Sequence, residues 1–184
     1  MEKKDRDKFE LPQVEVRLCL VPGKPLYSDR EIRGPEEAVA VMANAMACLD
    51  TERLCIVNMD AKGHPLCFCV VSIGDVTSTI VSMQSMFKSA VLTNASSIIA
   101  LHNHPAGSLR PSEQDVVATR QMIEAGKIMS IPLLDHVIVA GITGDYYSMR
   151  ENLPELFEGN TGKKICAEET CYGKEQGGSI NMGM

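Results

Sequence analysis

Apolar residues recur along this chain at two spacings, one helical and one alternating. The first helical stretch begins at Pro35, where a proline and two acids occupy the first turn. Its apolar positions repeat at helical spacing and predict a face packed on a core: Val39, Met42, Met46 and Leu49. Two further helices are expected, over Met83–Leu92 and from Ser112 to about Lys127.

Shorter apolar runs predict the strands. They are Leu54–Asp60, Leu66–Ile73, Ser97–Leu101, Leu133–Ala140 and Asp145–Met149. A short link containing Gly63 joins the first two, which is typical of a hairpin, and the last two are expected to pair across Gly141 and Gly144. Because strands and helices interleave, the pattern predicts a mixed α/β sandwich.

The two ends of the chain are less periodic. Val14–Val21 alternates at first and predicts one half-buried strand within an N-terminal extension, residues 1–34. The periodic region, residues 35–150, is expected to be the folded domain. Residues 151–184 are expected to form a flexible C-terminal tail, in which Gly, Lys and Glu dominate from Glu158 on.

Composition narrows the function classes. With 184 residues, 45% hydrophobic and 23% charged, the chain is typical of one globular domain. The net charge is −6 and no basic run is longer than two residues, so composition gives no support for DNA binding, although it leaves a local basic patch open. Neither a signal-peptide pattern nor a membrane-length apolar run is present, so we expect a cytoplasmic protein with no membrane partner.

The seven cysteines are odd in number and five lie in apolar stretches, so we expect thiols rather than a disulfide framework in a reducing compartment. Oligomeric state stays open at this level, although the apolar N-terminal strand could pair with a partner.

The most informative segment is His102-Asn103-His104-Pro105, followed at the next predicted helix by Asp115. In an extended strand, residues two apart share a face, so both imidazoles can reach one ion while Asn103 points away. Asp115 falls in the first helical turn and can return to the same ion. Two histidines and a carboxylate suit Zn²⁺, and three protein ligands leave a coordination position for water.

Two other interpretations compete with a metal site. Ser112-x-x-Asp115 is also the pattern of a helix capping box, and alone it favours a cap. A cap explains neither histidine, however, and two histidines on one strand face are hard to justify by stability. The literal string His-Asn-His is not an HNH nuclease signature, because that name refers to residues dispersed over a hairpin and a helix.

The same residues resemble a known family. His-x-His, seven residues, Ser, two residues, Asp matches the JAMM (MPN+) metalloprotease signature at every spacing. The stretch Ala95–Gly107, then Pro111-Ser112, then Asp135-His136 is similar to bacterial RadC-like JAB domains, over roughly Pro35 to Arg150. The resemblance implies a JAB/MPN-type α/β domain, in which helices flank a mixed, partly barrel-like β-sheet layered as in cytidine deaminases.

The resemblance also implies roles. His102, His104 and Asp115 would bind Zn²⁺, and Glu52, at the start of a strand, would be the general base for water on the metal. Glu36 and Glu37 are weaker candidates because they fall at a helix start. Ser112 would stabilise the oxyanion. The expected activity is zinc-dependent hydrolysis of peptide or isopeptide bonds in a peptide or protein substrate.

Other candidates carry less weight. Asp135-His136 could donate a hydrogen bond to a metal-binding side chain or could be a structural buried pair. His64 is expected in a solvated turn, and Cys166 and Cys171 could bind a metal in the tail, on weak evidence. The zinc deaminase pattern is absent.

The alternative function is that of a DNA-repair or mobile-element accessory protein, because RadC-like proteins carry a DNA-repair label. Residues 1–34 show no counterpart of the helix-hairpin-helix region that often precedes the domain in RadC proteins. A nuclease using the same metal is a third possibility.

Overall fold

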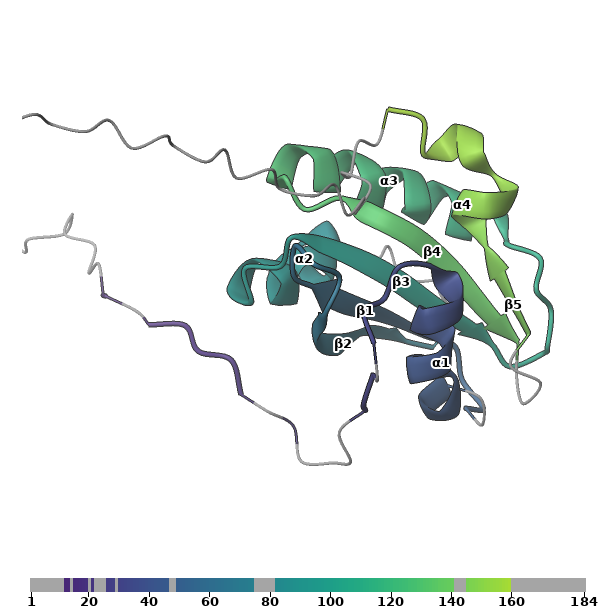
Figure 1. Cartoon of the computed structure of the whole chain (residues 1–184), viewed down its shortest axis with the longest axis horizontal. Coiled ribbons are helices and arrows are strands. Elements are labelled where there is room, and N and C mark those ends of the chain that lie inside the picture. The colour runs from purple at the N-terminus through teal and green to yellow at the C-terminus, as the bar shows by residue number, and fades with distance from the viewer. Residues whose placement is uncertain are drawn as a thin grey trace, which may run out of the picture.

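The computed structural model describes residues 12–13, 15–19, 21, 26–28, 30–46, 49–74, 82–140 and 145–159. Figure 1 shows their arrangement as a twisted sheet with helices on both faces. The elements in chain order are α1 (Pro35–Met46), β1 (Arg53–Met59), β2 (Pro65–Ile73), α2 (Met83–Leu92), β3 (Ser97–His104), α3 (Glu113–Met129), β4 (Leu133–Ala140), β5 (Asp145–Ser148), α4 (Met149–Asn152) and a 3₁₀ turn, η1 (Pro154–Leu156).

The five described strands form one mixed sheet in the order β2-β1-β3-β4-β5. β3 and β4 are parallel and are joined through α3, whereas the other neighbouring pairs are antiparallel. The predicted mixed α/β sheet flanked by helices is therefore confirmed. The described strands do not close into a barrel, because β2 and β5 remain at opposite edges.

Side-chain alternation on β3 divides the core into two layers. Ile98 and Ala100 pack toward α2 and α3, whereas Ile99 and Leu101 pack toward α1. Helices cover both faces of β3, so every residue of this strand is buried. His102, Asn103 and His104 continue the same alternation at the carboxyl end of the strand, which assigns each of them to one layer.

The packed region extends beyond the predicted domain boundaries. Ile32 is fully buried in the α1-side core, and its backbone N–H donates to the carbonyl of Gly63 (2.8 Å). Phe157 is buried in the other core, next to α4 and η1, so residues 151–159 are ordered structure rather than flexible tail. Residues 160–184 lie outside the described residues.

The strand expected over Val14–Val21 is not found where that stretch is described. Residues 15–19 and 21 are irregular and exposed. An isolated strand has no neighbour to bond its backbone groups, so alternation alone does not stabilise it. Within the described residues, none of the helices has the length and apolar character needed to cross a bilayer.

Candidate metal centre

The sheet topology brings the predicted site residues to one end of the molecule. β3 ends at His104, and the following helix α3 begins at the same end, with Asp115 in its first turn. β1 runs antiparallel to β3, so its amino end also lies there, with Leu54 paired to His102. Glu52 is two residues before Leu54 and therefore lies beside the histidines although it is distant from them in sequence.

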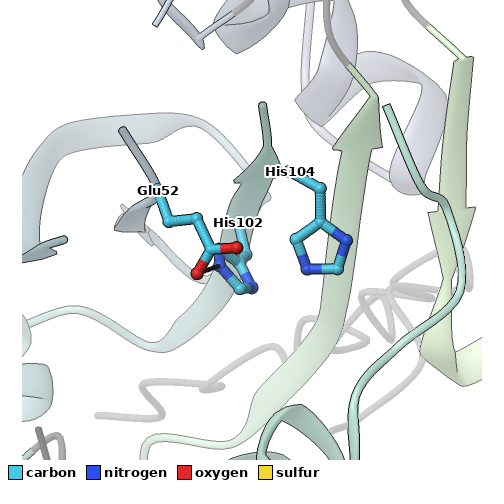
Figure 2. A group of neighbouring side chains, drawn as sticks. All are labelled: Glu52, His102 and His104. Atoms are coloured by element: carbon cyan, nitrogen blue, oxygen red, sulfur yellow. Dashed lines mark ion pairs between the residues drawn. The ribbon is translucent and has the colours of Figure 1, made fainter. Parts of the chain in front are cut away.

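Three of these side chains form a compact group. Glu52, His102 and His104 each offer one ligand atom, and these atoms all lie within 4.8 Å of one another. Figure 2 shows the Glu52 carboxylate directed at the His102 ring, with His104 beside it on the same strand. Glu52 Oε2 lies 3.7 Å from His102 Nε2. This spacing can accommodate one metal ion.

Asp115 contacts both imidazoles. Its Oδ1 lies 3.1 Å from His102 Nδ1, and its Oδ2 lies 3.6 Å from His104 Nε2. The carboxylate is buried, whereas the Glu52 side chain retains 32% of its exposure. The structure thus brings together all four residues, and the less exposed carboxylate is the one on the helix.

His104 is oriented by a backbone carbonyl. Its Nδ1 lies 2.8 Å from the oxygen of Ser108. A carbonyl can only accept, so Nδ1 carries a proton, and in the neutral ring Nε2 presents its lone pair to the site. A hydrogen bond of this kind fixes the ring of many metal-binding histidines. Ser108 lies in the loop that begins with Pro105 and Gly107. This loop therefore supplies the carbonyl that orients the His104 ring.

The ring nitrogens of His102 show whether these residues fit a metal ion. The residue is 1% exposed, and neither ring nitrogen has a hydrogen-bond partner among the described residues. The 3.1 Å contact of Nδ1 with Asp115 Oδ1 is close but lacks hydrogen-bond alignment. A buried, unpaired polar group costs about 1–3 kcal/mol. A cation bound by one nitrogen would offset this cost, so the donor set fits a metal such as zinc.

The electrostatics of the group favour a cation. Burial raises the pKa of Asp115, but interactions with His102, His104 and Ser112 together outweigh it, so the carboxyl pKa lies well below its usual range. The pKa of His104 is raised, chiefly through its interaction with Asp115 and against the effect of burial. Asp115 is therefore an anion at neutral pH, and it lies between two imidazoles.

Ser112 caps α3 and holds Asp115 at the same time. Its hydroxyl accepts from the Asp115 backbone N–H (3.1 Å), and Asp115 Oδ2 accepts from the Ser112 backbone N–H (2.8 Å). The hydroxyl also donates to Asp115 Oδ2 at 2.6 Å. The predicted capping box is confirmed, and it orients the carboxylate. The oxyanion role of Ser112 stays a prediction.

Asp135 and His136 are both buried, and their side chains have different partners. They are neighbours on β4 and point to opposite faces: Asp135 accepts from the Ser148 hydroxyl (2.6 Å) and from the Arg150 backbone N–H (3.0 Å). Burial raises the pKa of Asp135 to about 6. Both residues are buried, and because adjacent strand residues alternate in direction, each side chain has its own partners.

His136 faces the metal-centre side of the sheet. Its Nδ1 lies at hydrogen-bond distance, 2.6 Å, from the hydroxyl oxygen of Thr119, and that hydroxyl donates to the backbone carbonyl of Asp115 (2.6 Å). The His136 and His102 rings lie 6.1 Å apart. Burial lowers the pKa of His136 to about 3, so the ring is neutral. Sequence reasoning missed Thr119, a polar residue on the buried face of α3.

The remaining candidates lie elsewhere. His64 is half-exposed in the β1–β2 turn and contacts Asp60 (2.9 Å between Nδ1 and Oδ2). Glu36 and Glu37 lie on α1, on the opposite face of the sheet. Cys166 and Cys171 lie outside the described residues. Only Glu52, among the acids weighed as the base, lies against the histidines.

Comparison with known proteins agrees with this geometry. Residues 32–154 match the family model of the RadC-like JAB domain. The chain is 38% identical over 135 residues to a UPF0758 protein of Roseiflexus castenholzii, covering 73% of this chain and 56% of that protein. It is 42% identical over 145 residues to a UPF0758 protein of Syntrophomonas wolfei, covering 74% and 61%.

A third relative, a UPF0758 protein of Methanosarcina acetivorans, is 36% identical over 122 residues, covering 66% of this chain and 52% of that protein. The matches thus span little more than half the length of these curated relatives, and their shared name states no activity. The residues that match the family model, 32–154, include Glu52, His102, His104 and Asp115. The chain belongs to the RadC-like JAB domain family.

Proposed function

We propose that this domain is a zinc-dependent hydrolase of peptide or isopeptide bonds. The observation that carries the proposal is the convergence of Glu52, Asp115 and two histidines, one of which has both buried ring nitrogens unpaired. The donors are imidazole nitrogens and carboxylate oxygens, which Zn²⁺ accepts readily.

His102, His104 and Asp115 would hold the ion, and Glu52 would act as base. The division follows exposure: Asp115 is buried and fixed by Ser112, whereas Glu52 is the carboxylate that solvent and substrate can reach. The match to the JAMM spacing supports the same division. The zinc ion, when bound, supplies a Lewis acid that makes water more acidic.

Glu52 would take a proton from the attacking water and pass it to the leaving amine as the carbon–nitrogen bond breaks. Proton transfer by a positioned carboxylate contributes about 10²–10⁴-fold to such reactions. Ser112 is proposed to support the oxyanion, which requires its hydroxyl to turn from Asp115 toward the substrate carbonyl. The substrate class is a peptide or protein, as the JAMM resemblance implies.

The test is hydrolysis of a defined mixture of quenched fluorescent peptides by zinc-loaded protein. We expect zinc-dependent cleavage that chelation abolishes and that E52Q reduces about 10²-fold or more. E36Q is the matched control, because Glu36 is exposed on α1, across the sheet from the site. Plasmid DNA serves as a second substrate: metal-dependent nicking without peptide cleavage, or equal cleavage by E52Q and E36Q, would overturn the proposal.

A further inference from the structure

Asn103, between the two histidines, has a place in this site that no metal-binding role accounts for. We propose that Asn103 is a positioning residue that holds Glu52 at the metal centre. The inference rests on the proposed role of Glu52. It concerns the backbone that carries this carboxylate, not a further ligand.

The contacts of Asn103 bracket Glu52. Its side-chain Oδ1 accepts from the backbone N–H of Arg53 at 2.7 Å, and its Nδ2 donates to the backbone carbonyl of Thr51 at 3.1 Å. Thr51 and Arg53 are the residues on either side of Glu52. One buried carboxamide therefore fixes the chain immediately before and immediately after the base.

The Asn103 side chain takes the place of backbone pairing between β1 and β3. Paired residues of β1 and β3 run from Met59 and Ser97 to Leu54 and His102, where the pairing ends. A carboxamide offers the same carbonyl and N–H groups as a peptide unit. The Asn103 side chain thus extends the bonding between β1 and β3 beyond the last backbone pair. Glu52 lies at this point of the chain, beside the histidines.

A third contact completes the support. The backbone N–H of Gly74, just after β2, donates to the carbonyl of Glu52 itself at 2.9 Å. Gly74 has φ +101°, a conformation that other residues adopt only with strain. The Glu52 backbone is thereby bonded from β3 on one side and from the end of β2 on the other, while its carboxylate stays partly exposed.

The chemistry of the position specifies asparagine. Leucine has a similar size but would leave the Arg53 N–H and the Thr51 carbonyl without their partner. Aspartate would keep the acceptor but lose the donor, and it would bring a charge to a residue that is 2% exposed. A carboxamide satisfies both backbone groups from two separate atoms without bringing a charge.

The first measurement is hydrogen exchange of the segment around Glu52 in the metal-free protein. We expect N103L to raise the exchange of the Arg53 amide at least tenfold, whereas S148A leaves it unchanged. S148A is the matched control because Ser148 is also a buried polar residue that bonds backbone and side chain, but at Asp135 and α4. Unchanged exchange in N103L would overturn the proposed contact.

The second measurement is a double-mutant cycle on zinc affinity, by competition with a chelating dye. The carboxylate of Glu52 attracts the cation, so E52Q should weaken binding roughly tenfold or more. N103L should weaken it severalfold in the wild-type background and not further in E52Q. A merely structural role predicts equal effects of N103L in both backgrounds, and that result would overturn the positioning role.

The two failures are distinguishable. A wild-type protein that binds no zinc contradicts the proposed function, and the exchange measurement still decides whether Asn103 holds the segment. Where N103L does not fold, N103S replaces it with a shorter polar side chain, and the same pattern of coupling to E52Q is expected.

Discussion

Asn103 and His102 are neighbours on β3 and are equally buried, at 2% and 1% exposure, yet they differ in how their polar atoms are satisfied. The Asn103 amide bonds backbone groups with both its oxygen and its nitrogen. Neither ring nitrogen of His102 has a hydrogen-bond partner among the described residues. Burial alone therefore does not distinguish His102 from Asn103, whereas their hydrogen bonds do.

His136 is intermediate between them. Its Nδ1 pairs with Thr119, but its buried Nε2 has no partner within the described part of the chain. His136 and His102 share one face of the sheet and each has, among the residues described, an unpaired ring nitrogen, whereas Asn103, on the opposite face, bonds with both its amide oxygen and its amide nitrogen. We therefore expect added zinc to stabilise the protein through the histidine face of the sheet. On the opposite face, we expect replacement of Asn103 to destabilise it.

The largest expected effect is stabilisation of the wild-type protein by zinc. At a free zinc concentration a thousand times the Kd, binding adds about 4 kcal/mol to the free energy of unfolding. H104A should lose this gain, because it removes a nitrogen aimed at the ion, and H64A should keep it. Thermal unfolding with and without zinc measures both, and an equal gain in H104A would contradict the site.

Next in size is the contrast between two leucine substitutions in metal-free protein. N103L leaves two buried backbone groups unpaired and should cost about 2–4 kcal/mol. H102L removes nitrogens that have no hydrogen-bond partner among the described residues, together with the 3.1 Å contact to Asp115, so its cost should be smaller than that of N103L. Urea unfolding of both variants gives the comparison. Equal losses would show that His102 is as well satisfied as Asn103.

Asp135 extends the contrast to a buried charge. Burial raises its pKa from 3.8 to about 6, so the folded state holds the proton more tightly than the unfolded state. Stability from this group is full below pH 3.8 and is lost as the pH rises through about 6, by up to about 3 kcal/mol. Relative to D135N, the wild type should therefore lose stability over this window, as urea unfolding at several pH values will show. A constant difference would contradict it.

The smallest expected effect concerns the cap of α3. S112A removes a hydroxyl that accepts from the Asp115 N–H and should cost about 1 kcal/mol. S82A is the matched control, because Ser82 caps α2 without a side-chain hydrogen bond. Denaturant midpoints of the two variants measure the effect. Equal midpoints would mean that the Ser112 contacts add nothing to stability.

Much of the fold could be predicted from the spacing of apolar residues. These residues recur at helical spacing in the helices and lie in short apolar runs in the strands. Alternation on β3 placed both histidines on one face and Asn103 on the other, as predicted. The ordered segment around Phe157 was missed because charged and polar neighbours hide a single buried aromatic. The expected strand at Val14–Val21 had an alternating pattern but no neighbour that could be read from the sequence.

The site was predicted in part, for a similar reason. His102, His104 and Asp115 are close in sequence, so their spacing carries geometric information. Glu52 came only from the family resemblance, since no local pattern says that β1 lies beside β3. The partners of Asn103 lie about fifty residues away, and they became visible only when the register of the two strands was known.

The most direct test of the metal centre is the zinc content of protein purified by identical steps and dialysed against metal-free buffer. We expect about one zinc per chain in the wild type and in H64A, and almost none in H104A. Equally little zinc in all three proteins, or as much zinc in H104A as in the wild type, would contradict the central claim.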